Sequence, residues 1–250
     1  MNDMFRLDGK SALVSGAGRG IGLAAAEALA RAGAEVTLAA RTAAEIETEA
    51  ERLRGEGLKA RAMQLDVGDL AASAEAIAGG GPFDILVNNA GTNRPAGFLE
   101  VTPEDYDAVT DLNVRSAFFV AQAVAKGLVA AGRPGSIINM SSQMGHVGGL
   151  RRTVYCASKH AMEGFTKAMA LDLAPYGIRV NTVCPTFIET PMTRPFLADP
   201  KFLGETLAKI PLGRLGQVGD VAGAIVYLAS DASGLVTGSA LRVDGGWTAV

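Results

Sequence analysis

One stretch near the amino terminus decides the fold of this chain: Ser11-Ala12-Leu13-Val14-Ser15-Gly16-Ala17-Gly18-Arg19-Gly20-Ile21-Gly22. Its first five residues are typical of a buried strand, and an alanine-rich helical segment follows the glycines. Glycines at 16, 20 and 22 let the backbone turn sharply and approach a pyrophosphate, which the N–H groups of the helix can bind. The GxxxGxG spacing alone is weak evidence, but the strand before it and the helix after it predict a dinucleotide-binding turn.

Apolar segments alternate with helical ones along almost the whole chain of 250 residues. The predicted strands are residues 11–15, 35–40, 59–65, 84–87, 136–141, 179–184 and 240–243. The predicted helices are residues 20–32, 43–55, 70–78, 103–131, 154–176 and 218–230. The strands are continuously apolar, as expected when helices cover both faces of a parallel sheet. This order predicts one α/β domain over residues 1–250, with a doubly wound, Rossmann-type parallel sheet of about seven strands.

Residues 187–211 interrupt the alternation with four prolines and a short helical stretch. They follow the sixth predicted strand, at the edge of the sheet where ligands bind in such folds. We therefore expect them to form a substrate lid.

Composition excludes several classes of function. A formal net charge of −3 gives no electrostatic reason to expect nucleic acid or an anionic membrane as a partner. Charges interrupt every apolar run before it reaches about 18 residues, and the first residues do not form an apolar signal segment. The two cysteines, Cys156 and Cys184, lack CxxC spacing, and the two histidines lack an HExxH pattern, so neither a disulfide nor a metal site is predicted. These features are typical of a cytoplasmic protein.

The end of the second predicted strand indicates the cofactor. NAD sites usually have an acidic residue there, which binds the ribose 2′-hydroxyl. This chain has Ala40-Arg41 instead, and Arg19 lies beside the glycine turn. Because two guanidinium groups can hold a 2′-phosphate that a carboxylate would repel, we favour NADP(H). NAD(H) is the alternative if both arginines are ordinary surface residues.

Tyr155 and Lys159 lie four residues apart at the start of a predicted helix, so both side chains share one face. A free tyrosine has a pKa near ~10, and a nearby ammonium group would lower it by stabilising the phenolate. Such a pair is common by chance, but Ser141 and Ser142 end the fifth predicted strand shortly before it. Because side chains alternate along a strand, only one of these serines is expected to face the site.

Polar residues also end the third and fourth predicted strands. Asp66-Val67 follows the third and is predicted to contact adenine, with capping of the next helix as the alternative for Asp66. Asn88-Asn89-Ala90-Gly91 ends the fourth strand. Asn113 falls inside the long fourth helix, where asparagine is unfavourable. This indicates a polar task for Asn113, with a solvent-facing position as the alternative.

Taken together, these motifs resemble the short-chain dehydrogenase/reductase family over essentially the whole chain. The matching motifs are Ser15-Gly16-x-x-x-Gly20-x-Gly22, Asn88-Asn89-Ala90-Gly91, Asn113, Ser142, Tyr155-x-x-x-Lys159 and Val243-Asp244-Gly245-Gly246. The resemblance implies an NAD(P)-dependent alcohol dehydrogenase or carbonyl reductase that assembles as a homotetramer.

The resemblance also implies roles for single residues. Asn113, Ser142, Tyr155 and Lys159 would form the catalytic tetrad: Ser142 orients the substrate carbonyl, Tyr155 exchanges the proton, Lys159 also binds the nicotinamide ribose, and Asn113 holds a water that links Lys159 to solvent. The residues expected to bind the cofactor are Gly16, Arg19, Gly20, Ile21, Gly22, Arg41, Asp66, Val67, Asn89, Ala90, Gly91, Tyr155, Lys159, Pro185, Ile188 and Thr190.

Two positions depart from the family pattern. Ser15 stands where the family usually has threonine, a change that keeps the hydroxyl. Pro185-Thr186 stands where the family usually has Pro-Gly. Because threonine tolerates a positive φ poorly, the backbone and the pocket size at this point are open.

The expected substrate pocket is polar. Its predicted lining is Arg94, Gln143, Met144, His146, Arg151, Arg152, Phe187 and the lid residue Arg194. Arginines suit a carboxylate or a polyhydroxylated chain, although Arg151 and Arg152 are equally consistent with a surface loop. Similarity of residues 179–190 to sugar-acid and polyol members of the family favours a sugar, sugar acid or polyol as the small-molecule substrate. The alternatives are a 3-oxoacyl-thioester (acyl carrier protein) reductase and a non-catalytic dinucleotide-binding sensor, which the full tetrad disfavours.

Overall fold

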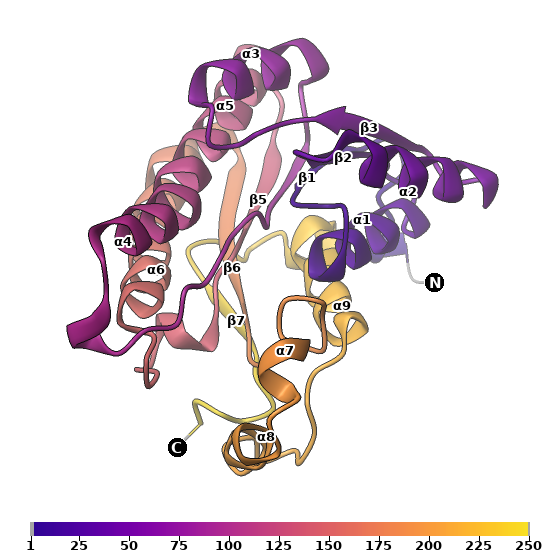
Figure 1. Cartoon of the computed structure of the whole chain (residues 1–250). Helices are drawn as coiled ribbons and strands as arrows, with labels where there is room; N and C mark the ends of the chain where they lie inside the picture. Colours follow the sequence, from indigo (N-terminus) through magenta and orange to yellow (C-terminus); the bar gives the residue numbers. More distant parts are fainter. Residues whose placement is uncertain (1–2, 250) are drawn as a thin grey trace.

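The computed structural model describes residues 3–249 and arranges them in three layers (Figure 1). A seven-stranded parallel sheet of order β3-β2-β1-β4-β5-β6-β7 forms the middle layer. Its strands are β1 Ser11–Ser15, β2 Glu35–Ala40, β3 Ala60–Gln64, β4 Ile85–Asn88, β5 Gly135–Met140, β6 Ile178–Pro185 and β7 Ala240–Val243. The predicted doubly wound parallel sheet is therefore confirmed.

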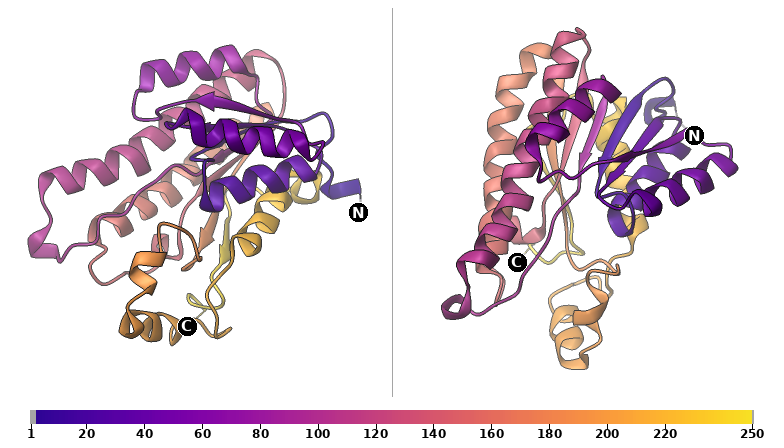
Figure 2. Two further views of the ribbon diagram at one scale, coloured as in Figure 1. Left: turned by 45° about the vertical axis from the view of Figure 1, so that its right-hand side comes forward. Right: turned by 45° about the horizontal axis from the view of Figure 1, so that its top comes forward.

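Helices cover both faces of the sheet (Figures 1 and 2). One face carries α1 Gly20–Arg31, α2 Ala43–Gly55 and α9 Val218–Ala229, and the other carries α3 Leu70–Gly80, α4 Pro103–Thr110, α5 Ala117–Ala130 and α6 Thr153–Leu173. Each interface is filled by fully buried aliphatic side chains such as Leu29 on the first face and Leu128 on the second, each stabilising the fold by roughly 1.5–3 kcal/mol. Among the described residues, no helix is long and apolar enough to cross a membrane.

The prediction of one regular helix over residues 103–131 is wrong. A π-helical segment, Asp111–Ser116, separates α4 from α5. The wider turn inserts an extra residue, which changes the direction of the side chains beside it. It leaves Asn113 fully buried, with its amide bound to the backbone of Thr92. The alternative of a solvent-facing position for Asn113 is thereby excluded.

Residues 187–211 contain two short helices, α7 Arg194–Leu197 and α8 Pro200–Leu207, where one helical stretch was predicted. They lie beyond the carboxyl edge of the sheet, outside the three layers (Figure 2). The ring of Phe187 packs against Phe202 of α8 and against Trp247, with ring centroids 5.5 and 5.8 Å apart. Aromatic contacts therefore hold this segment to the carboxyl-terminal part of the chain.

β1 and β4 are neighbours in the middle of the sheet. The strands that follow β1 are added towards one edge of the sheet, and those that follow β4 are added towards the other. This switch point is where open α/β sheets bind ligands. The hydroxyl of Ser15 accepts hydrogen bonds from the backbone N–H groups of Asn89 at 3.0 Å and Ala90 at 3.1 Å. Serine thus provides at this position the oxygen that threonine would provide, and it ties the two strand ends together.

Gly22 allows α1 to pack closely on the turn before it. A Cβ added there would collide with the carbonyl oxygen of Gly16 and lie 2.5 Å from Nδ2 of Asn89. We expect Gly22→Ala to lower the free energy of unfolding by about 1–3 kcal/mol, because these packed groups must move. Urea unfolding measures the loss.

The matched control is Gly79→Ala in α3, where an added Cβ meets no atom within 4 Å. Alanine favours a helix over glycine by up to about 1 kcal/mol, so this variant should be as stable as the parent or more so. Equal losses in both variants would contradict the packing role of Gly22.

Candidate active site

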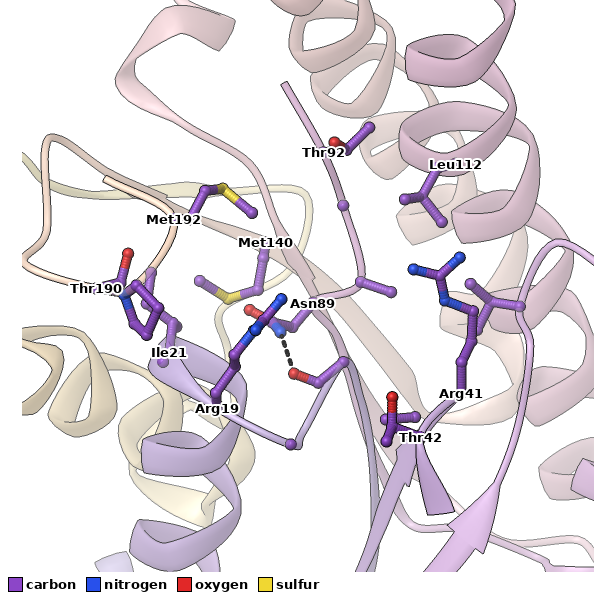
Figure 3. Close-up of a pocket in the computed structure, with 18 of the residues that line it drawn as sticks. Arg19, Ile21, Arg41, Thr42, Asn89, Thr92, Leu112, Met140, Thr190 and Met192 are labelled. Atoms are coloured by element: carbon purple, nitrogen blue, oxygen red, sulfur yellow. Dashed lines mark hydrogen bonds between the residues drawn. The ribbon is translucent and has the colours of Figure 1, made fainter. Parts of the chain in front are cut away.

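A cavity of about 320 Å³ opens at the carboxyl edge of the sheet, at the switch point between β1 and β4 (Figure 3). Every residue predicted to bind the cofactor lines it, except Gly22 and Ile188. Gly22 lies beneath the turn, as its packing requires, and Ile188 is buried, with a backbone bridge to Gly216. The structure therefore brings together residues that are widely separated in the sequence.

The glycine turn forms one wall of this cavity. Gly16 and Gly20 adopt positive φ angles of 65° and 60°, which favour glycine. Nδ2 of Asn89 donates to the carbonyl oxygen of Gly16 at 3.2 Å (Figure 3) and to that of Ser15 at 3.1 Å. Arg19 is the N-cap of α1 but provides no side-chain cap, so the first N–H groups of the helix stay available to an anion.

Arg19 and Arg41 lie on either side of Asn89 in the close-up, one from the start of α1 and the other from the end of β2 (Figure 3). Both are exposed, and neither forms an ion pair within residues 3–249. A carboxylate, Glu45, also lines the cavity close to Gly18. The cavity end near β2 thus offers two cations and two carboxylates, those of Glu45 and Asp66.

Asp66 lines the same end of the cavity but does not cap α3. Its Oδ1 accepts a hydrogen bond from the N–H of Gly68 at 3.0 Å within a tight turn. The cap of α3 is Asp69, which accepts from the N–H of Ala72 at 3.1 Å. The alternative role considered for Asp66 is therefore wrong, and its carboxylate is available to a ligand.

Tyr155 lines the opposite end of the cavity together with Ser141, whereas Ser142 does not line the cavity but is hydrogen-bonded to the Tyr155 phenol. Tyr155 stands in the first turn of α6, and Ser142 follows β5. The Ser142 hydroxyl donates to Oε1 of Gln143 at 2.7 Å and accepts from the N–H of Met144 at 3.1 Å. Burial raises the pKa of the Tyr155 phenol above its ordinary value, and a hydrogen bond with Ser142 acts in the lowering direction. The phenol therefore holds its proton at neutral pH, which differs from the lowering expected from a lysine alone.

Lys159 lies one turn further along α6, only 5% exposed. Its Nζ donates to the carbonyl oxygen of Met140, the last residue of β5, at 2.7 Å, and lies 5.6 Å from the centroid of the Tyr155 ring. Burial lowers the pKa of Lys159 to about 8, against the raising effect of Cys184 and Glu163 nearby. The ammonium group is thus both anchored to the strand end and able to exchange a proton close to neutral pH.

Asn113 reaches the site from the π-helical segment. Its Oδ1 accepts from the N–H of Thr92 at 2.8 Å, and its Nδ2 donates to the carbonyl oxygen of Thr92 at 2.9 Å and to Oγ of Ser158 at 3.1 Å. Both amide hydrogens are therefore used. The side chain fixes the segment after β4 against the helix that carries Tyr155 and Lys159.

Behind the site, Cys184 is the centre of a buried polar cluster. Its Sγ donates to Oε1 of Glu163 at 3.3 Å and lies 3.4 Å from Nε2 of His146. Burial and the neighbouring Glu163 raise the pKa of the thiol to about 12. These contacts join the three groups in one hydrogen-bonded cluster. His146, which was expected in the substrate pocket, therefore joins the loop after β5 to β6 and α6.

The residues predicted to line the substrate pocket are not brought to one wall. Arg94 is half exposed and pairs with Asp105 at 2.7 Å on the surface. Arg151 is 59% exposed, with its nearest carboxylate, Glu100, at 3.7 Å. Arg152 differs from both, because it is buried beside Tyr155.

The other predicted pocket residues pack inside the protein. Gln143 and Met144 are buried in the short turn after Ser142, and Phe187 packs among aromatic rings. Thr186 is unstrained, because Arg151, with φ of 58°, is the one described residue other than glycine with a positive φ. Substitution of the usual glycine at 186 therefore leaves the backbone next to the cavity regular.

Sequence reasoning missed several residues of the cavity wall. Thr42 and Glu45 follow the second strand, Leu112 precedes Asn113, and Thr92 and Met192 lie close to predicted residues in the sequence (Figure 3). Proximity to the motifs was the available signal. Residue type was not, since leucine and methionine are far more often core residues than ligand contacts.

Comparison with known proteins extends the similarity to nearly the whole chain. A family profile described as "Enoyl-(Acyl carrier protein) reductase" matches residues 16–248. L-xylulose reductase of Bos taurus is 43% identical over 98% of this chain and 98% of its own length. Gluconate 5-dehydrogenase of Gluconobacter oxydans (strain 621H) is 41% identical over 98% of this chain and 97% of its own length.

A solved structure is equally similar. The crystal structure of a gluconate 5-dehydrogenase from Burkholderia cenocepacia J2315, in complex with NADP and tartrate, superposes with a TM-score of 0.96 at 41% identity. The match covers 99% of this chain and 98% of that one. Both the sequence and the fold are therefore shared along the full domain.

The buried Lys159 makes stability depend on pH. Its pKa is about 8 in the folded protein and 10.5 ordinarily, so between these values the unfolded chain binds more protons at this side chain. The free energy of unfolding should therefore rise with pH across this window, by up to about 3 kcal/mol from this group. Urea unfolding of the parent and of Lys159→Met, between pH 7 and 10.5, measures the difference. A difference that does not change with pH would contradict the lowered pKa of Lys159.

Proposed function

Because the chain belongs to the short-chain dehydrogenase/reductase family, we propose that it is an NADP(H)-dependent oxidoreductase of a secondary alcohol or ketone in a sugar, sugar acid or polyol. The observation that carries the proposal is that Lys159 and Tyr155, whose phenol is hydrogen-bonded to Ser142, line one end of the cavity. The relatives named L-xylulose reductase and gluconate 5-dehydrogenase support a polar, hydroxylated substrate.

The cavity is suited to a dinucleotide. Gly16 and Gly20 let the backbone approach a pyrophosphate, and the uncapped start of α1 offers N–H donors to it. Arg19 and Arg41 would hold a 2′-phosphate, and Asp66 would accept from the adenine amino group. Thr190 would bind the nicotinamide end, which supplies or accepts the hydride when bound.

Tyr155 is the proposed proton donor in carbonyl reduction. Its raised pKa keeps the phenol protonated, and Ser142, which already contacts it, would donate its hydrogen to the same substrate oxygen in place of the present bond to Gln143. In alcohol oxidation the proton moves the other way, so oxidation needs the phenolate. The phenolate then takes up the proton of the alcohol, and the Lys159 ammonium, 5.6 Å from the centroid of the Tyr155 ring, stabilises the phenolate before that transfer.

Asn113 is proposed to complete a path for protons to solvent. Because Thr92 and Ser158 use both of its amide hydrogens, a water at this point would bind as a donor, to a carbonyl oxygen of the π-helical segment. Irregular turns of this kind are frequent at functional sites.

Residues 187–211 would close over the substrate as a lid of the single domain. The homotetramer and the cytoplasmic location stay predictions.

Removal of one oxygen tests the role of Tyr155. We expect Tyr155→Phe to lower kcat by about 100- to 10,000-fold, because a positioned proton donor is lost, while NADPH binding is retained. Tyr176→Phe, at an exposed tyrosine, is the control and should leave kcat unchanged. Turnover of sugar acids, polyols and 3-oxoacyl thioesters with both cofactors is the measurement. Activity confined to the thioesters, or full activity of Tyr155→Phe, would overturn the proposal.

The choice of cofactor is tested at Arg41. Arg41→Gln should lower kcat/KM for NADPH by about 10- to 100-fold, since a charge-assisted contact to the 2′-phosphate is lost, and should leave kcat/KM for NADH nearly unchanged. Arg54→Gln, on the exposed face of α2, is the control. Equal losses with both cofactors would argue against a 2′-phosphate site.

A further inference from the structure

Arg152 is a buried cation without an anionic partner. It is 7% exposed, although arginine is almost never buried unless paired. Within residues 3–249 its guanidinium has one hydrogen bond, from Nη1 to the carbonyl oxygen of Arg151 at 3.3 Å, and no carboxylate contacts it. Burying an unpaired charge is costly, so the site is expected to acquire an anion when it works.

The surroundings of Arg152 further favour an anion at this position. It occupies the N-cap position of α6, where the helix dipole is positive, and its side chain makes no capping hydrogen bond. The first turn of α6 carries no acidic residue. A helix of 21 residues therefore begins with a cation and unpaired N–H groups, and all of them favour a negative charge nearby.

The position of Arg152 places this expected anion site beside the proposed proton donor. Tyr155 follows three residues later, in the first turn of α6. The charge of Arg152 acts on the Tyr155 phenol. The guanidinium stacks on the ring of Phe196 in α7, 5.4 Å from its centroid, and so lies beneath residues 187–211.

We propose that Arg152 binds the carboxylate of the substrate, so that the enzyme acts on hydroxy acids of the aldonate type in preference to neutral sugars and polyols. This rests on the proposed oxidoreductase function. The substrate carboxylate would pair with the fork of guanidinium N–H donors, its hydroxyl or keto group would lie at Tyr155, and Phe196 would shield the ion pair from water. The relatives include a protein named for gluconate, which carries a carboxylate, and one named for xylulose, which carries none.

The test compares two compounds that differ by one charge: D-gluconate and D-glucitol, in which the carboxylate becomes CH₂OH. The parent enzyme with NADP should show the higher kcat/KM for gluconate. Arg152→Met should lower that value by about 10- to 100-fold and change the value for glucitol by less than about threefold. Arg152→Lys should retain part of the gluconate activity, because it keeps the charge but loses the fork. Arg151→Met, the exposed neighbour, is the matched control and should change neither value.

Binding separates this inference from the proposed function. Calorimetry of gluconate with the NADPH-saturated protein should detect binding in the parent and in Arg151→Met, and a loss of at least tenfold in affinity in Arg152→Met. Turnover of glucitol with no gluconate binding would overturn the role of Arg152 and leave the oxidoreductase function standing. Gluconate binding that depends on Arg152, without turnover of any sugar, sugar acid or polyol, would overturn the function and leave the anion site standing. Equal losses of kcat/KM for both compounds in Arg152→Met would contradict carboxylate binding and show that Arg152 acts only by supporting Tyr155.

Discussion

Parallel strands end in backbone N–H and C=O groups that no neighbouring strand can pair, and the rest of this structure depends on how they are satisfied. At the switch point, the Ser15 hydroxyl accepts from the N–H groups of Asn89 and Ala90, and the Asn89 amide donates back to the carbonyl oxygens of Ser15 and Gly16. The two halves of the sheet are thereby joined by side-chain bonds at the place where the cavity opens. A cofactor binding there meets a rigid backbone, which reduces the ordering that binding requires.

The same constraint produces the chemistry at the neighbouring strand. Lys159 satisfies the carbonyl oxygen of Met140 at the end of β5, and in doing so its ammonium is held beside Tyr155. Asn113 likewise satisfies both backbone groups of Thr92 after β4. Residues proposed for catalysis therefore also complete the edge of the sheet. Burial at this edge lowers the pKa of Lys159 and raises that of Tyr155, so both pKa values are shifted at the site where proton transfer is proposed.

Arg152 does not follow this pattern, because no group of the described protein neutralises it. In a family with one scaffold, differences in substrate are expected to lie in single positions around the site and not in the fold. A buried, unpaired guanidinium next to the proton donor is such a position. It also gives the aromatic ring of Phe196 a partner, so substrate charge and the placement of residues 187–211 are connected through one side chain.

Much of this protein was predictable from the sequence because the deciding patterns are local. Continuous apolar strands, the glycine turn and the spacing of Tyr155 and Lys159 each depend on a few neighbouring residues, and together they predicted the sheet and most of the cavity wall. The π-helical segment was not predictable, because it arises with a contact between Asn113 and Thr92, far apart in the chain. The surface position of Arg94, the burial of Arg152 and the raised pKa of Tyr155 were decided by tertiary structure alone. Burial and charge pairing depend on which distant segments pack together, and no local pattern in the sequence records that.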